Sequence, residues 1–267
     1  MNKSPEDIVS HFYNTVGWKL TDDLTEDAIR FEDLRDCAKN YVSKCRTRVF
    51  KHIPSKGKFI LDMASGPIQY KEYLNYSINF EKRYCVDLST DALVMAEKKI
   101  GDHGVYINKS FFDINFQENF FDCAISMHTI YHMDKNLQEE AVRKLLFVTK
   151  KNMPVIIVYS NKNTILSKIK RPIIKIRDKF INKKYTNTSA ELYFEPYDFS
   201  WWKQFEDVAE ISFFPWRSFN SSDQKILFPN NKIGSWMFDF LYKFEELFPN
   251  IFSKYFQYPL IVLKKKY

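Results

Sequence analysis

The chain has 267 residues, of which 45% are hydrophobic and 17% aromatic, and its formal net charge is +7. This composition predicts a folded protein with a substantial core and argues against disorder. The modest positive charge allows anionic partners, but it does not require nucleic acid, which we do not expect as a partner.

The four cysteines show neither C-x-x-C nor zinc spacing: Cys37, Cys45, Cys85 and Cys123. We expect reduced core thiols and no metal site. The N-terminal M-N-K-S-P-E-D is too acidic and polar for a signal peptide, and no apolar run approaches membrane-spanning length. The expected protein is soluble and cytoplasmic.

Two helices are predicted before the first strand. Ser4-Pro5-Glu6-Asp7 is a strong helix start, with Ser as N-cap and Pro at the first helical position, and this helix should end near Gly17-Trp18. A second should begin after Thr25-Glu26-Asp27 and close at Pro54 and Gly57. Apolar residues recur along it at three-to-four spacing, which predicts one inward face: Leu34, Cys37, Ala38, Tyr41, Val42, Cys45 and Val49.

Strands and helices then alternate. The expected strands are Phe59–Asp62, Arg83–Asp87, Val105–Asn108, Phe121–Met127 and Pro154–Tyr159. Helices are expected at Ile68–Tyr76, from the Ser89 or Thr90 cap to Gly101, and at Leu137–Lys150. Apolar strands alternating with amphipathic helices predict a parallel sheet covered on both faces. A helix opening at Ser200-Trp201-Trp202 and strands at Val208–Phe214 and Tyr258–Leu263 follow.

The stretch Lys58–Tyr70, K-F-I-L-D-M-A-S-G-P-I-Q-Y, predicts a strand, a tight turn and a helix start. Such a turn presents backbone N–H groups to a ligand at the carboxyl end of a strand. Asp87 ends the second strand 21 residues after Gly66, where a carboxylate can bind a ribose diol. A dinucleotide site needs three glycines, but the positions hold Ala64, Gly66 and Gln69. This favours a cofactor without phosphates, S-adenosylmethionine, over NAD.

Three segments carry a family resemblance: I-L-D-M-A-S-G-P, V-D-L-S-T-D-A-L and F-Q-E-N-F-F-D-C-A-I-S-M-H-T-I-Y-H-M. Over about Gly57 to Tyr159 the chain resembles class I S-adenosylmethionine-dependent methyltransferases that act on small molecules. The resemblance implies an α/β fold with a Rossmann-like seven-stranded sheet, mostly parallel with a terminal antiparallel hairpin. It also implies helices on both faces and an inserted lid.

The resemblance further implies the cofactor-binding residues. Asp62 and the backbone of Ala64, Ser65 and Gly66 would hold the methionine moiety, and Asp87 would bind the ribose. The adenine would lie against the loop of Ser110 and Phe111, and Leu88 and Met127 would complete the site. The chain departs from the family at Ala64 and Ile68, which replace common glycines, and at Ser110, where Asp is frequent.

Two histidines follow the fourth strand, where the transferred methyl group would point. Either His128 or His132 can serve as a general base for a hydroxyl acceptor, and one of them can instead tie down the loop. A metal site from this H-x-x-x-H spacing lacks an apparent third ligand. Tyr131 between them, and Tyr13 and Trp18 in the leading helix, are candidates for substrate contact or for plain helix packing.

A basic segment follows the fifth strand. Residues 161–184 hold nine Lys or Arg against one acid, interleaved with isoleucines. Such a run is usually a solvated face, but here it also suits an anionic acceptor or a membrane surface. We expect residues 1–56 to cover the cofactor site, 57–160 to form the core, 161–200 a basic lid, and 201–267 the rest of the same domain.

The sequence thus predicts an enzyme that methylates an oxygen of a small molecule, such as a sugar or glycan precursor. A lipid or quinone methyltransferase at the membrane surface is the alternative enzyme. A non-catalytic S-adenosylmethionine-binding protein is the alternative of another class.

Overall fold

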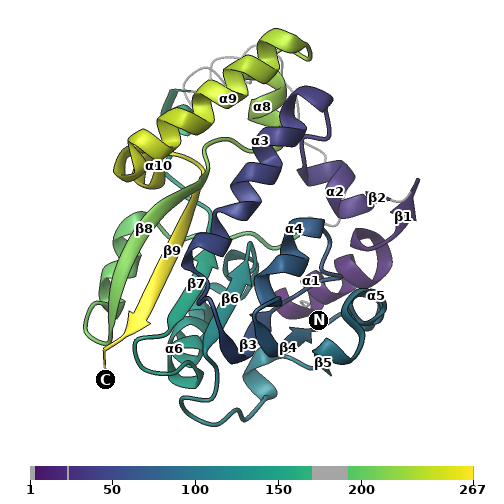
Figure 1. Ribbon diagram of the computed structural model, residues 1–267, viewed down its shortest axis with the longest axis vertical. Coiled ribbons are helices and arrows are strands. Elements are labelled where there is room, and N and C mark those ends of the chain that lie inside the picture. The colour runs from purple at the N-terminus through teal and green to yellow at the C-terminus, as the bar shows by residue number, and fades with distance from the viewer. Residues whose placement is uncertain (1–3, 23, 170–191, 267) are drawn as a thin grey trace.

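The computed structural model describes residues 4–22, 24–169 and 192–266 (Figure 1). Most of the expected basic segment, residues 170–184, lies outside the described residues. Within them, no helix is both long and apolar enough to cross a membrane.

A seven-stranded sheet forms the centre of the fold. Its strands are β3 (Gly57–Met63), β4 (Phe80–Asp87), β5 (Gly104–Asn108), β6 (Cys123–Met127), β7 (Pro154–Val158), β8 (Ala209–Arg217) and β9 (Tyr258–Lys265). They lie in the order β5-β4-β3-β6-β7-β9-β8, parallel from β5 to β7, and β9 runs antiparallel to both neighbours. The predicted Rossmann-like sheet with an antiparallel end is confirmed. β1 (Leu20–Thr21) and β2 (Leu24–Thr25) form a separate small pair.

Alternate residues of the central strands enter two cores. Leu61, Ala124, Val155 and Ile157 pack with α6 (Gln138–Val148) and the 3-10 helix η8 (Phe199–Phe205) on one face. Ile60, Ile125, Ile156 and Val158 face the other side, with Val49 and Trp216. Because successive side chains of a strand point to opposite faces, the apolar runs predicted from the sequence fill both layers.

The N-terminal region begins as predicted and then differs. In α1 (Pro5–Phe12) the Ser4 side chain accepts from the Asp7 backbone N–H, and the π-helix η1 (Tyr13–Gly17) continues it to the expected end. The expected second helix is wrong as one element, because it divides into α2 (Glu26–Phe31) and α3 (Asp36–Thr47). The buried Asp33 carboxylate between them pairs with Arg35, whose guanidinium also donates to the carbonyls of Phe228 and Gln224. Tertiary contacts there override local helix propensity.

Of the helices predicted between the strands, one begins as expected and another is shorter than expected. α5 (Thr90–Ile100) has the predicted Ser89 cap, whereas the helix expected at Ile68–Tyr76 is reduced to α4 (Lys71–Leu74) and the 3-10 turn η3 (Asn75–Ser77). Short 3-10 turns occur at η2 (Val49–His52), η4 (Gly101–His103), η5 (Phe111–Asp113), η6 (Ile130–His132) and η7 (Lys135–Leu137).

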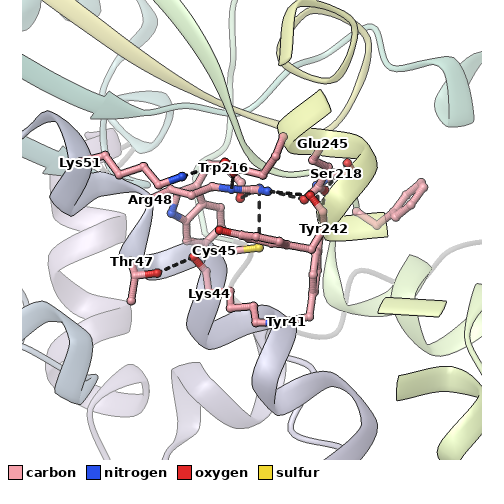
Figure 2. Close-up of polar contacts among 12 residues, drawn as sticks. Tyr41, Lys44, Cys45, Thr47, Arg48, Lys51, Trp216, Ser218, Tyr242 and Glu245 are labelled. Atoms are coloured by element: carbon pink, nitrogen blue, oxygen red, sulfur yellow. Dashed lines mark hydrogen bonds and ion pairs between the residues drawn. The ribbon is translucent and has the colours of Figure 1, made fainter. Parts of the chain in front are cut away.

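The connection between β8 and β9 is helical, which the sequence analysis did not foresee. It consists of α8 (Ser221–Leu227), α9 (Lys232–Leu247) and α10 (Pro249–Tyr255). α9 packs on α3 through a buried polar network (Figure 2). Arg48 Nη1 donates to Glu245 Oε2 at 2.8 Å, and the Tyr41 hydroxyl donates to Glu245 Oε1 at 2.6 Å. All four cysteines are free and buried, as expected.

Candidate active site

A cavity of about 400 Å³ lies where β3, β4 and β6 end. In open parallel sheets, ligands bind outside the carboxyl ends of the strands at the point where the strand order reverses, which here is between β3 and β6. The volume lies within the range of small-molecule sites. The cavity wall contains every predicted site residue except Ser110: Tyr13, Trp18, Asp62, Ala64, Ser65, Gly66, Asp87, Leu88, Phe111, Met127, His128, Tyr131 and His132.

Ser110 differs from its expected role. Its hydroxyl donates to Glu6 Oε1 at 2.5 Å and accepts from the Phe112 N–H, so it caps η5 and ties it to α1. The neighbours Lys109, Phe111 and Phe112 line the cavity instead. The loop therefore reaches the cavity, but this side chain is not part of its wall.

The turn after β3 has the backbone shape that glycines favour. The φ angles are +56° at Ala64, +54° at Gly66 and +48° at Ile68. The two positions that depart from the family pattern therefore keep its left-handed backbone, at a steric cost for residues with a Cβ. Ile68 offsets this cost by burying its side chain beside Cys85 and Leu93. A methyl group added at Gly66 would lie 3.2 Å from the ring of Trp18, which directly follows η1, so this ring closely covers the turn.

Asp87 joins the turn to the end of β4. Its Oδ2 accepts from the Gly66 N–H and its Oδ1 from the Ser89 N–H, each at 2.8 Å. Burial raises the pKa of this carboxyl to about 6, against the lowering effect of those two amide hydrogen bonds. A carboxylate has about four acceptor sites, so two remain for hydroxyl groups of a ligand.

Asp62 is held by a partner that the sequence analysis missed. Its Oδ2 accepts from Arg83 Nε at 3.0 Å and from Arg83 Nη2, and Arg83 Nη1 donates to the Tyr73 carbonyl at 2.6 Å. Both side chains are almost fully buried and both line the cavity. Asp62 is thus fixed in orientation, while its Oδ1 accepts no hydrogen bond from the described part of the chain.

His128 has an unusual backbone and one unpaired nitrogen. Its φ is +61°, a strained conformation that is typical of functional positions. Nδ1 lies 2.9 Å from the Tyr131 hydroxyl, whereas the buried Nε2 has no hydrogen-bond partner among the residues that the structure describes. Burial, together with the positive charge of Arg217, lowers the pKa of this imidazole well below its usual value. The ring is therefore neutral at physiological pH.

His132 is engaged with the backbone. Its Nδ1 lies 2.6 Å from the Tyr193 carbonyl oxygen, so Nδ1 carries the proton and donates it. This bond ties η6 to the segment that leads into η8. Burial lowers the pKa of His132 to about 4, and this imidazole is also neutral.

A second group of polar residues lines the cavity beside the N-terminal helices. The Tyr13 hydroxyl lies 3.4 Å from Asp27 Oδ1, and Arg217 Nη1 donates to Glu32 Oε2 at 2.9 Å. Burial, and then the charge of Glu32, raise the pKa of Asp27 to about 7. The buried Nε atom of Arg217 has no partner in the described ranges.

These residues were missed for an identifiable reason. Asp27 and Glu32 lie at the start and in the interior of a helix predicted from the sequence, and Arg217 lies beyond the predicted strand Val208–Phe214. Each is a charged residue with an apolar neighbour on one side only, which is no distinctive sequence signal. In the described part of the chain, no group of three or more His, Cys, Asp or Glu side chains could hold a metal ion.

Comparison with known proteins agrees with this geometry. Residues 61–157 match the family model described as a methyltransferase domain. No curated protein sequence matches the chain.

Solved structures with a similar fold share little sequence with the chain. A SAM-dependent methyltransferase from Archaeoglobus fulgidus is 13% identical to this chain with a TM-score of 0.53, and the alignment covers 85% of this chain and 94% of the Archaeoglobus chain. A Burkholderia thailandensis 1,6-didemethyltoxoflavin-N1-methyltransferase, bound to its substrate and S-adenosylhomocysteine, has 10% identity and a TM-score of 0.50 over 85% and 79%. A Haemonchus contortus phosphoethanolamine N-methyltransferase has 13% identity and a TM-score of 0.55 over 99% of this chain and 60% of its own.

Proposed function

We propose that this chain, a class I S-adenosylmethionine-dependent methyltransferase, transfers a methyl group to an oxygen of a small molecule such as a sugar or glycan precursor. The structural neighbours named above act on different acceptors, so the fold does not specify one. The observation that carries the oxygen assignment is the neutral His128, a residue of the cavity wall whose buried Nε2 has no hydrogen-bond partner among the described residues.

The residues present fit S-adenosylmethionine. The strained turn at Ala64–Gly66 places backbone groups and Asp62 beside the cavity, suited to a methionine moiety. Asp87 has unused acceptor sites for a ribose diol, Leu88 adjoins it, and Phe111 offers a ring for the adenine. When bound, the cofactor supplies a methyl group already activated on a sulfonium.

The protein then has to orient the acceptor and accept its proton. His128 Nε2 can take the hydroxyl proton if Nδ1 carries the other proton and donates it to the Tyr131 oxygen. A base of low pKa accelerates less than one matched to the working pH, so we expect a contribution near the lower end of the usual range, about 10²-fold. Alignment of the two reactants supplies the larger part, roughly 7–11 kcal/mol. His132 is the second candidate, although its Nδ1 is committed to the Tyr193 carbonyl.

The acceptor end of the cavity suits a polar molecule. Tyr13, Asp27 and Tyr131 offer hydroxyl and carboxyl groups, and Trp18 stacks on Tyr13 with ring centroids 4.7 Å apart. The positive charge of Arg217, a residue of the cavity wall, would favour an anionic substituent on the acceptor. In this account residues 1–56 cover the cofactor, 57–160 form the core, 161–200 act as a basic lid, and 201–267 complete the domain, in a cytoplasmic enzyme.

A lipid or quinone acceptor is the second candidate, with residues 161–184 making the membrane contact. It is favoured by the apolar cavity wall near the second histidine, where Met133, Leu137, Leu192 and Phe194 lie. A protein that binds S-adenosylmethionine without catalysis is the remaining alternative.

A labelled-methyl assay tests the proposal. The protein is incubated with methyl-labelled S-adenosylmethionine and sugars, lipids and quinones in parallel, and label is expected in the hydroxyl-bearing polar acceptors. His128→Ala should lower the turnover of the active acceptor about 100-fold while leaving cofactor affinity unchanged. His103→Ala is the matched control, because that imidazole bonds to the Ser77 carbonyl outside the cavity wall.

Label that enters only lipids or quinones would replace the first candidate by the second. Cofactor binding with no transfer to any acceptor class would favour the non-catalytic alternative. Equal turnover of the His128→Ala and His103→Ala variants would remove the general base from the account.

A further inference from the structure

The outer face of α9 and α10 carries a continuous row of exposed apolar side chains. Trp236, Phe240 and Leu247 are 66%, 49% and 67% exposed, and the row also contains Ile233, Phe244, Phe248, Ile251 and Tyr255. Ring centroids lie 5.6 Å apart between Trp236 and Phe240 and 4.4 Å apart between Phe240 and Phe244. At 3.6 residues per turn the exposed apolar residues of α9, Ile233, Trp236, Phe240, Phe244 and Leu247, fall within an arc of about 80°. α9 lies along an outer edge of the molecule (Figure 1).

The buried side of α9 fixes which face points outward. Phe238 stacks on Tyr41 of α3 with ring centroids 5.0 Å apart, and Gly234 lies against the Pro229 carbonyl oxygen. Glu245 is fully buried and binds Arg48 and Tyr41, as Figure 2 shows. α9 cannot rotate its apolar row inward without leaving the buried Arg48 charge unpaired, which is costly. The row is therefore a rigid feature of the folded chain.

The charges around this row are arranged asymmetrically. The acids of α9 point toward α3 and η2: Asp239 binds Lys44, Glu245 binds Arg48, and Glu246 binds Arg48 and Lys51. The exposed lysines beside the row, Lys232, Lys243 and Lys254, form no ion pair with a described acid. The charge left on the outer face of α9 and α10 is thus positive.

The start of the basic segment adjoins the same face. Asn161 Nδ2 donates to the carbonyls of Lys254 and Phe256 at 2.8 and 3.1 Å. Beyond it, Ile165 and Ile169 are 42% and 56% exposed, and Lys168 is exposed between them. Exposed isoleucine and lysine thus follow a residue that is hydrogen-bonded to the end of α10.

We propose that the α9–α10 face is a docking surface for an anionic membrane. Trp, Phe and Tyr rings with flanking lysines are the residues that lie at the headgroup level of a bilayer, where rings enter the acyl boundary and ammonium groups meet lipid phosphates. A second copy of the chain suits the face less well, because two-fold pairing of this surface would bring its unpaired lysines together without acids to neutralise them. The surface is separate from the cofactor cavity, so this proposal stands whatever the acceptor is.

Vesicle co-sedimentation tests the proposal with the full chain. The protein is mixed with phosphatidylcholine vesicles and with vesicles of phosphatidylcholine and phosphatidylglycerol in equal amounts. We expect sedimentation with the anionic vesicles and a marked decrease as salt is raised. The paired substitution Trp236→Asp with Phe240→Glu should lower the partition coefficient at least about tenfold, and Lys232→Glu with Lys243→Glu should have a similar effect at low salt.

Phe147→Glu is the matched control, because Phe147 is 48% exposed, as Phe240 is 49%, but lies on α6. Affinity for S-adenosylmethionine should be unchanged in all these variants, which shows that they fold. The proposal is overturned if wild-type protein sediments with neither vesicle, or if Phe147→Glu reduces binding as much as the α9 variants do. It is also overturned if the chain forms a dimer that the α9 variants dissolve and shows no vesicle binding.

Discussion

Replacing Glu245 should reveal how strongly the helical connection is held to α3. In Glu245→Gln the side chain keeps its size, but one oxygen becomes an N–H₂ group. The present oxygens accept from four donor groups of three residues: Arg48 Nη1 at 2.8 Å, the Tyr41 hydroxyl at 2.6 Å, the Ser218 backbone N–H at 3.1 Å and the Ser218 hydroxyl. The new amide nitrogen must therefore face a donor in either orientation. The substitution also removes the buried negative charge that Glu245 places beside Arg48, whose side chain is 3% exposed.

The expected loss follows from that burial. Breaking a buried ion pair by removing one partner costs about 3–5 kcal/mol of unfolding free energy. At about 2–4 °C per kcal/mol for a chain of this size, the melting temperature should fall by roughly 6–20 °C. Glu139→Gln is the control, because its i,i+4 pair with Arg143 is 46% and 40% exposed and is worth about 0.3–0.5 kcal/mol.

Urea denaturation followed by tryptophan fluorescence, with thermal melting in parallel, measures these losses. Adding Arg48→Met to Glu245→Gln should destabilise by less than the sum of the two single changes, because the buried charge that has lost Glu245 is then removed as well. A Glu245→Gln loss no larger than that of Glu139→Gln would refute the reasoning.

Two further predictions concern the turn and its carboxylate. Ala64→Gly should stabilise the protein by roughly 0.5 kcal/mol in urea denaturation, because glycine relieves the strain of the left-handed φ by more than the added entropy of the unfolded chain costs. The control Ala92→Gly, in the helix α5, should destabilise the protein by at least about 1 kcal/mol. A loss of stability in Ala64→Gly would show that this backbone is not strained. Because the pKa of Asp87 is raised to about 6, its charge costs folding stability above that pH, and the cost disappears as pH falls toward 4. If only the ionised Asp87 carboxylate binds ribose, cofactor affinity of the wild type should fall by up to about tenfold for each pH unit below 6. The control Asp91→Asn, which removes an exposed carboxylate, should show the same pH dependence, whereas Asp87→Asn should not. Equal pH profiles of all three proteins would contradict this prediction.

The sheet was predictable because its signals are local. The end of β3, which lies at Met63 and one residue past the predicted Asp62, the end of β4 at Asp87 and the Ser89 helix cap each follow from a few consecutive residues. The missing glycines at Ala64 and Ile68 were visible as well, although only the structure shows that the backbone remains left-handed there.

The missed features depend on contacts between distant segments. The break at Asp33 requires Arg35 to reach carbonyls of residues 224 and 228, and no pattern within residues 25–54 records that. Arg83 reads as an ordinary residue of a strand until the sheet brings it to Asp62. α9 was overlooked although its apolar spacing is regular, because its apolar residues cover two faces rather than one.

Calorimetric titration of S-adenosylmethionine, and of its demethylated product S-adenosylhomocysteine, tests the central claim most directly. We expect one molecule of either ligand to bind per chain. Asp87→Ala removes hydrogen bonds from the ligand to a charged acceptor, which are worth about 1.5–3 kcal/mol of binding free energy, so binding should weaken at least tenfold. The control Asp91→Ala should bind as the wild type does. Absence of binding by the wild-type chain at any concentration tested, or equal affinity of the Asp87→Ala and Asp91→Ala variants, would contradict the account.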